Sequence, residues 1–227
     1  MAGQPPPSGV PGDAPPDSRE PAQGRARDRP LPFPSTAFDV VALATSAGGI
    51  QALSKLLAGL PRGFPAAIVI VLHLDPRRRS VIAGILGRQT SLRVKEAEDG
   101  DRLSPGMVYT APPNHHLLVN PDGSLSLSES AVVHFVRPSA DLLFESLAAS
   151  YQDRAIAVVL TGAGVDGSQG LRAVKKMGGT VIVQDEQTSD VFGMPAAAIA
   201  TGTADFVLPL GEIPAALVTL VTEAHRS

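Results

Sequence analysis

Three apolar runs in the chain each lead to a polar residue that can take part in acyl transfer. Residues 40–45 lead to Ser46, residues 68–72 lead to His73, and residues 157–160 precede a glycine-containing loop that reaches Asp166. A serine hydroxyl becomes an effective nucleophile when a histidine takes its proton, and a carboxylate can hold that histidine in the required tautomer. The residue types therefore predict an acyl-transfer site, provided that the fold brings them together.

The apolar runs themselves indicate how this would happen. Fully apolar segments of this length are typical of buried parallel strands. In open α/β sheets, sites form just outside the carboxyl ends of the strands. We therefore expect Ser46, His73 and Asp166 to meet at one edge of a parallel sheet.

Each candidate also has a purely structural interpretation. Ser46 lies in Ala44-Thr45-Ser46-Ala47-Gly48, which lacks only the first glycine of the G-x-S-x-G nucleophile elbow, and the amides after it could hold an oxyanion. Alternatively, Ser46 caps a helix that begins near Gly49. His73 can equally be a polar loop residue, and Asp166 can be the N-cap of the next helix. The sequence leaves these alternatives open.

Strand and helix patterns alternate along most of the chain. Strands are expected over residues 38–45, 66–72, 156–161, 180–184 and 206–208. Helices are expected over residues 49–60, 80–88, 139–150 (with Ser139 as N-cap), 168–177, 195–201 and 213–225. Repeated strand–helix units of this kind predict a doubly wound α/β fold with a mostly parallel sheet in a Rossmann-like, three-layer arrangement.

The region between residues 92 and 127 departs from this alternation. Short β-like pieces at 92–97, 107–111, 116–119 and 124–127 are separated by turn sequences, including Asn120-Pro121-Asp122-Gly123. This pattern predicts a small antiparallel hairpin between about Met107 and Leu127.

Residues 1–36 differ in composition from the rest. Ten of the 21 prolines lie between Pro5 and Pro34, among few large apolar residues. Such a segment cannot bury enough surface to offset the entropy lost on ordering, and it has no apolar core of a secretory signal. We expect a disordered tail over 1–36 and a single catalytic domain over 37–227.

The composition also limits the kind of protein. The chain has no cysteine, a net charge of −3 and 4% aromatic residues. Disulfides and thiolate metal sites are excluded, and a nucleic-acid partner is disfavoured. No apolar stretch approaches the ~20 residues that span a bilayer, so we expect a cytoplasmic protein without membrane insertion.

The chain resembles the catalytic domain of the chemotaxis protein-glutamate methylesterases (CheB type). The similarity follows the family's order across essentially all of the predicted domain. The matching stretches are Ala44–Gly49, His73, Ala111-Pro112 with His116, Arg137–Phe144, Leu160–Gly167, Gln184-Asp185-Glu186 and Val191–Pro195.

This resemblance implies hydrolysis of γ-glutamyl methyl esters on methylated chemoreceptors or related signalling proteins, together with deamidation of receptor glutamines. It implies Ser46 as nucleophile, His73 as general base and Asp166 as its orienter, with no metal or organic cofactor. The family usually has methionine where this chain has Ala163, in a loop thought to supply an oxyanion-hole amide. A backbone N–H survives that change, so we expect an altered pocket shape and not a loss of catalysis.

The family's catalytic domain usually follows a phosphorylatable receiver domain. Residues 1–36 have neither the length nor the acidic strand ends of one, so we expect phosphorylation control to come from a separate receiver-domain protein. Two other functions are compatible with the fold. One is a non-chemotaxis signalling scaffold or binding module. The other is a nucleotide-binding domain built on Gly48-Gly49, which the missing G-x-G-x-x-G spacing disfavours.

Overall fold

The computed structural model describes residues 1, 3–4, 40–73 and 81–223. Contacts divide the chain into two units, Met1–Pro30 and Leu31–Ser227, and nearly all described residues belong to the second. The tail predicted for 1–36 therefore lies almost entirely outside the described residues. The start of the predicted first strand (38–39), the start of the predicted second helix (80) and the end of the predicted last helix (224–225) also lie outside them.

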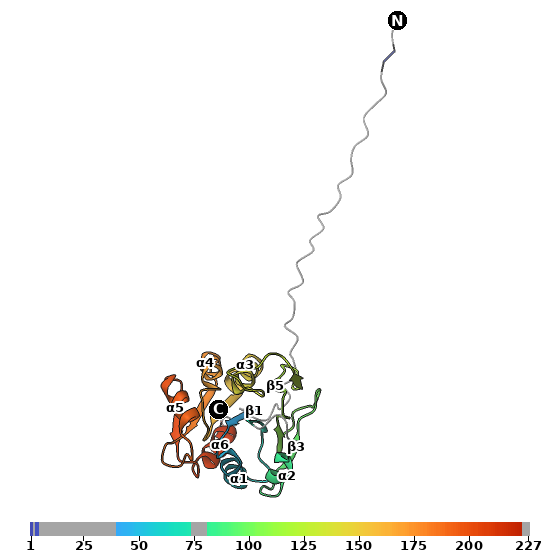
Figure 1. The fold of residues 1–227 in the computed structure, drawn as a ribbon. Coiled ribbons are helices and arrows are strands. Elements are labelled where there is room, and N and C mark those ends of the chain that lie inside the picture. The colour runs from blue at the N-terminus through green and yellow to red at the C-terminus, as the bar shows by residue number, and fades with distance from the viewer. Residues whose placement is uncertain (2, 5–39, 74–80, 224–227) are drawn as a thin grey trace. The chain divides into compact units, whose positions relative to one another are not determined.

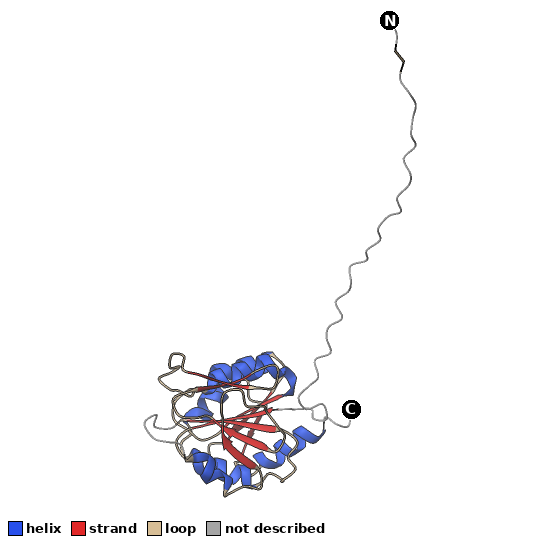
Figure 2. Ribbon diagram, turned by 90° about the vertical axis from the view of Figure 1, so that its right-hand side faces the viewer, coloured by secondary structure: helices blue, strands red, loops and turns tan. Residues whose placement is uncertain are grey.

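Seven parallel strands form the centre of the second unit, in the order β3-β4-β2-β1-β7-β8-β9. The central strands β1, β2 and β7 are apolar and fully buried because helices cover both faces of the sheet, as Figure 2 shows. Their bounds are β1 Val40–Thr45, β2 Ala67–Leu72, β3 Arg93–Glu96, β4 Met107–Thr110, β7 Ala155–Val159, β8 Thr180–Gln184 and β9 Phe206–Leu208.

The helices pack in two layers, which alternate strand residues face in turn. Val41 and Leu43 of β1 belong to one core cluster with residues of α1, α2 and α6, whereas Ala42 and Ala44 belong to the other with residues of α3, α4 and α5 (Figure 1). The helices are α1 Gly49–Ala58, α2 Ile82–Gly87, α3 Ala140–Tyr151, α4 Ser168–Lys176, α5 Gly193–Ala200 and α6 Ile213–Glu223, with a 3-10 turn, η1, at Gln152–Arg154. None of the described helices is long and apolar enough to cross a bilayer.

The predicted fold class is confirmed, but the predicted extent of the hairpin is wrong. Among the described strands, β5 (His116–Val119) and β6 (Leu125–Ser128) form the antiparallel pair. Met107–Thr110 instead forms β4, which lies between β2 and β3 in the parallel sheet. The physical reason is burial on both faces, since Val108 contacts one core cluster and Tyr109 the other.

The strand order places a topological switch point at the centre of the sheet. β1 lies between β2 and β7, so the chain winds outward in opposite directions from this strand. Ligands of open α/β sheets bind at such a switch point, outside the carboxyl ends of the strands. The three predicted site residues follow β1, β2 and β7.

Candidate active site

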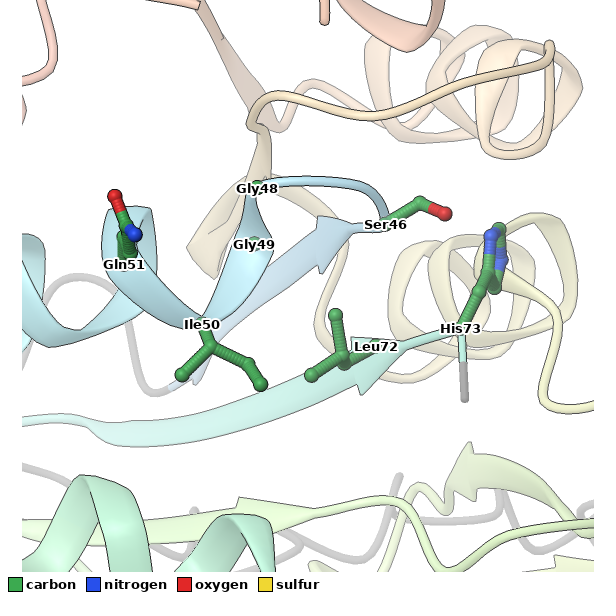
Figure 3. Close-up of a pocket in the computed structure, with 7 residues that line it drawn as sticks. All are labelled: Ser46, Gly48, Gly49, Ile50, Gln51, Leu72 and His73. Carbon is green, nitrogen blue, oxygen red and sulfur yellow. The ribbon is translucent and has the colours of Figure 1, made fainter. Parts of the chain in front are cut away.

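Ser46 and His73 lie at the carboxyl ends of two paired strands. Ser46 directly follows β1 and His73 directly follows β2. Both line a cavity of about 270 Å³, together with Gly48, Gly49 and other residues of the first turn of α1. Figure 3 shows the Ser46 hydroxyl pointing toward the imidazole ring of His73. Among the residues that the structure describes, Ser46 Oγ accepts or donates no hydrogen bond, so it is free for a substrate.

His73 and Asp166 are in direct contact. His73 Nε2 donates a hydrogen bond of 2.9 Å to Asp166 Oδ2, and the side chains are only 12% and 4% exposed. A carboxylate can only accept, so this bond fixes the tautomer that carries its proton on Nε2. The other ring nitrogen, Nδ1, then has a free lone pair that can accept a proton.

The Asp166 carboxylate lies at the amino terminus of α3. It accepts hydrogen bonds from Ser139 Oγ (2.8 Å) and from the backbone N–H groups of Ala140 (2.6 Å) and Asp141 (3.2 Å). Burial by itself raises the pKa of the Asp166 carboxyl, but the hydrogen bonds from His73, Ala140 and Ser139 together hold that pKa below its usual range. Asp166 is therefore an ionised and fully bonded partner for the imidazole.

These contacts answer the structural alternatives. Asp166 does cap a helix, but the helix is α3, because the N-cap of α4 is Gly167. Ser139 occupies the predicted N-cap position of α3, yet its hydroxyl bonds Asp166 and not its own helix. Ser46 is not a cap, since α1 begins after Gly48 and has no side-chain cap. The cap interpretation of Ser46 is therefore wrong.

A second histidine lies behind Asp166 and was given no role from sequence. His116 is fully buried; its Nε2 donates to the carbonyl of Ala131 (3.1 Å), and its Nδ1 accepts from the N–H of Ser139 (3.1 Å). Burial lowers the pKa of His116, so the ring stays neutral and keeps the Nδ1 lone pair that Ser139 needs. His116 therefore holds Ser139 in place, and Ser139 in turn donates a hydrogen bond to Asp166. The sequence signal for a role of His116 is that this residue belongs to one of the stretches that carry the family resemblance.

Two threonines hold the turn that carries Ser46. Thr45 Oγ1 and the N–H of Ser46 both donate to the carbonyl of Thr161, over 2.6 and 3.1 Å. Thr161 Oγ1 in turn lies 3.0 Å from the carbonyl oxygen of Ala47, to which it donates. Sequence reasoning missed both roles, because the hydroxyls bond backbone more than a hundred residues away along the chain.

Glycine at 162 is required by the closeness of the two strand ends. A Cβ at this position would lie 3.0 Å from Ser46 N and closer still to the sulfur of Met194. The N–H of Gly162 donates to the carbonyl of Val191 over 2.8 Å, and its carbonyl accepts from the N–H of Met194 over 2.7 Å. The loop after β7 is therefore packed directly against the backbone of Ser46.

Backbone amides near Ser46 can accommodate an oxyanion. In the described part of the chain, no hydrogen-bond acceptor is found for the N–H groups of Ala47 and Ala163, and both residues are exposed. Preorganised N–H groups beside a nucleophile stabilise the negative oxygen of a tetrahedral intermediate. A phosphate at the same turn would meet Asp190, whose Oδ2 would lie 2.6 Å from a Cβ on Gly48. This carboxylate disfavours the nucleotide-binding alternative.

The described residues at this edge of the sheet do not assemble a set of metal ligands. Within the described ranges, no group of three or more histidine, aspartate or glutamate side chains is arranged to hold an ion. The expectation that catalysis needs no metal or cofactor stays a prediction.

The fold and the arrangement of the site residues together indicate a class of protein. A parallel α/β sheet with a serine, a histidine and a hydrogen-bonded aspartate at its carboxyl edge is typical of serine hydrolases. The comparison with known proteins is narrower, since the CheB methylesterase family model matches residues 41–217. The chain belongs to this family.

Relatives and a solved structure agree with this assignment. A protein-glutamate methylesterase/protein-glutamine glutaminase of Moorella thermoacetica is 44% identical over 198 residues, which cover 86% of this chain and 47% of the relative. This chain thus spans about half of that relative. A putative enzyme of the same name from Leptospira interrogans is 41% identical over 183 residues, covering 81% of this chain and 95% of the relative. The crystal structure of the Thermotoga maritima CheB methylesterase catalytic domain matches with a TM-score of 0.78 at 42% identity, covering 81% of this chain and 99% of that one.

Proposed function

We propose that this protein is a protein-glutamate methylesterase that hydrolyses glutamate methyl esters on chemoreceptor-type signalling proteins. The observation that carries the proposal is the hydrogen-bonded pair His73–Asp166 beside the cavity that Ser46 and His73 share. Family membership supplies the substrate class, because the similar proteins are named for this activity. A cytoplasmic site of action is part of the proposal.

In the first half of the reaction, Ser46 Oγ attacks the ester carbonyl. His73 Nδ1 takes the hydroxyl proton, and Asp166 stabilises the resulting imidazolium through the 2.9 Å bond to Nε2. The negative oxygen of the tetrahedral intermediate can be held by the amides of Ala47 and Ala163. His73 then gives its proton to the departing methoxide, which leaves as methanol, and an acyl group remains on Ser46.

In the second half, water replaces the alcohol. His73 takes a proton from water, the hydroxide attacks the acyl carbon, and the proton passes to Ser46 Oγ as the glutamate leaves. A receptor glutamine has the same acyl centre, with ammonia as the leaving group. We therefore include deamidation in the proposed activity, in line with the second name of the relatives.

The test follows methanol release from a methylated receptor fragment incubated with wild type and with Ser46→Ala. We expect release by the wild type and none above background by Ser46→Ala. The same fragment carrying glutamine at the methylation positions should release ammonia with the same dependence on Ser46. Equal release by both proteins would reject the role of Ser46. No release by either would reject the receptor as substrate and favour a signalling scaffold.

A further inference from the structure

The segment between β6 and α3 reaches the candidate site without a role in the proposed reaction. Its tip residues His134 and Phe135 line a cavity of about 230 Å³ together with His73, Asp166 and the loop that contains Val165. His73 and Asp166 are used by the triad. The tip is the part of this cavity wall whose purpose the chemistry leaves open.

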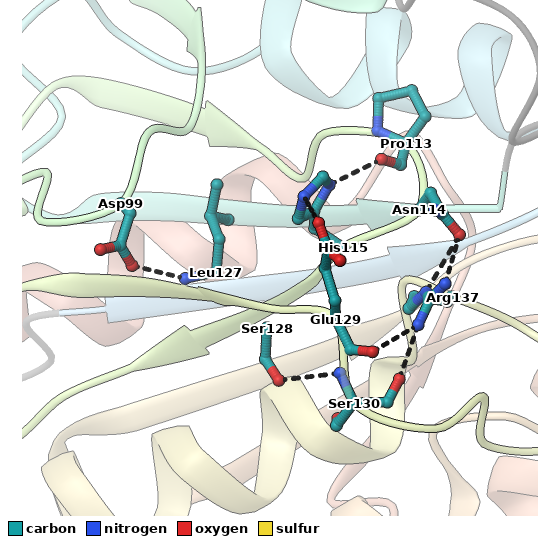
Figure 4. A network of polar contacts seen from close by, with 9 residues as sticks. All are labelled: Asp99, Pro113, Asn114, His115, Leu127, Ser128, Glu129, Ser130 and Arg137. Carbon is teal, nitrogen blue, oxygen red and sulfur yellow. Dashed lines mark hydrogen bonds and ion pairs between the residues drawn. The ribbon is translucent and has the colours of Figure 1, made fainter.

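The base of this segment is fastened to the folded unit by Arg137. Its Nη1 donates to the carbonyls of Glu129 (2.6 Å) and Ser130 (2.8 Å), while Nε and Nη2 both donate to Asn114 Oδ1 over 3.0 and 2.7 Å (Figure 4). One guanidinium therefore joins both ends of the segment to the loop before β5. The tip therefore extends from a base that these hydrogen bonds hold in place.

The residue types at the tip are unusual for the backbone conformation that they adopt. Val133 and Val136 exchange two backbone hydrogen bonds of 3.2 and 2.9 Å around a two-residue turn, in which His134 and Phe135 have φ of 49° and 66°. Turns with two such residues favour Asn and Gly, because a side chain in the left-handed region costs free energy. Residues held in this region against their preference are concentrated at functional sites.

Phe135 obtains no stabilisation from the fold in return. Its side chain is 98% exposed, so its ring remains in water. Val165, on the other wall of the same cavity, is 51% exposed, and Val132 near the tip is 55% exposed. Apolar side chains grouped beside a site in this way are typical of surfaces that a partner covers.

We propose that Phe135 is a specificity-determining residue, which packs against an apolar side chain that neighbours the modified glutamate on the substrate protein. This inference rests on the proposed function and adds how the substrate is recognised. The triad contacts the ester, whereas Phe135 contacts the protein surface around it. A small ester lacks that surface and therefore cannot use Phe135.

The experiment compares two substrates for Phe135→Ala, namely a methylated receptor fragment and p-nitrophenyl acetate. Truncating an aromatic residue at the centre of an interface typically costs about tenfold or more in affinity. We expect kcat/KM for the receptor to fall about tenfold more than kcat/KM for p-nitrophenyl acetate, mainly through KM. The matched control is Phe206→Ala, since Phe206 is 42% exposed but begins β9, an outermost strand of the sheet, and lines neither cavity at the site. This control should change neither value.

A second variant separates recognition from a structural role. Asn adopts the left-handed conformation more readily than Phe, so Phe135→Asn should keep or raise the melting temperature while losing receptor turnover as Phe135→Ala does. Phe135→Leu, which keeps an apolar side chain, should recover part of the receptor kcat/KM.

The outcomes are distinct. Equal losses on both substrates, or a lower melting temperature in Phe135→Asn, would assign Phe135 to the structure and overturn the inference. An unchanged receptor kcat/KM in Phe135→Ala would overturn it while leaving the proposed function intact. No methanol release by the wild type would reject the proposed function itself, and this inference with it.

Discussion

The two sides of the candidate site are built in opposite ways. Asp166 is 5% exposed, and its carboxylate accepts hydrogen bonds from a ring, a hydroxyl and two backbone amides. Ser46 is half-buried, and its hydroxyl has no partner among the described residues; only its backbone is bonded. The Asp166 end of the proposed triad is thus held through hydrogen bonds to its own side chain, whereas the Ser46 end is held through hydrogen bonds to the main chain of its turn.

This difference shows how a reactive hydroxyl can be positioned by hydrogen bonds that do not engage its own oxygen. The imidazole must keep one orientation and one tautomer, so the carboxylate that orients it is fully bonded. The nucleophilic oxygen must form a new bond, so any strong partner in the resting protein would have to be broken first. Thr45 Oγ1 and the Ser46 N–H donate to the carbonyl of Thr161, and Thr161 Oγ1 donates to the carbonyl of Ala47. These bonds place the turn and leave the Ser46 hydroxyl without a partner among the described residues.

The largest effect is expected for Ser46, the proposed nucleophile. Ser46→Ala should lower kcat for ester hydrolysis by about 10⁴- to 10⁶-fold, because no other hydroxyl replaces the attacking oxygen. The free energy of unfolding should stay within about 0.5 kcal/mol of wild type, since no hydrogen bond of the side chain is lost. Methanol release and urea unfolding measure the two quantities. A large loss of stability would contradict the contrast between the two sides.

Asp166 should affect both activity and stability. Asp166→Asn should lower kcat by about 10⁴-fold, because an amide favours the wrong imidazole tautomer. Asp166→Ala should in addition lower the free energy of unfolding by about 3 kcal/mol, since buried donors at the start of α3 lose their acceptor. Asp190→Ala, an exposed carboxylate near the same edge, is the stability control and should be silent. Equal stability of both alanine variants would contradict the capping role of Asp166.

His116 offers two variants that separate its hydrogen bonds. Asn can keep the acceptor for the Ser139 N–H, whereas Gln can keep the donor to Ala131 but leaves Ser139 without its acceptor. We expect His116→Gln to lose about tenfold in kcat through a loosened Asp166, which corresponds to one hydrogen bond. His116→Asn should lose less. The reverse order, measured with p-nitrophenyl acetate, would show that the bond to Ala131 matters more.

The smallest effect concerns acid stability. The pKa of Asp166 is lower in the folded protein than in the unfolded chain, so its contribution is complete above the unfolded value of about 3.9 and is lost as the pH falls below it. Urea unfolding between about pH 5 and pH 3 should therefore show a steeper loss for wild type than for Asp166→Asn. The raised pKa of Asp141 is caused mainly by burial, which is present in both proteins, and acts in the opposite sense; the part caused by the Asp166 charge is present in the wild type alone. Parallel curves would contradict this contribution of Asp166.

The sequence predicted the strand ends well because their signal is local. An apolar run followed by a polar residue is visible in the letters, and the parallel sheet brings such ends together. The position of β4 was not predicted, because a four-residue strand buried on both faces has the same pattern as half of a hairpin. Whether a short apolar run forms a central strand or half of a hairpin depends on the segments beside it in space, and the sequence alone does not give these.

Side-chain partners were harder to predict than positions. Ser139 has the residue type and place of an N-cap, and only the fold shows that its hydroxyl bonds Asp166, 27 residues away along the chain. The roles of Thr161 and His116 were missed for the same reason, since each depends on a distant strand or loop. Phe135 was not singled out, because neither its exposure nor its left-handed backbone is visible in the sequence.

The central claim is that Ser46, His73 and Asp166 act as one catalytic unit, and a double variant tests it most directly. Methanol release from a methylated receptor fragment would be measured for Ser46→Ala, His73→Ala and the variant carrying both changes. Members of a triad are strongly non-additive, so we predict that each single change costs several orders of magnitude and the double change little more. Losses that multiply in the double variant, or a Ser46→Ala protein as active as wild type, would contradict the account.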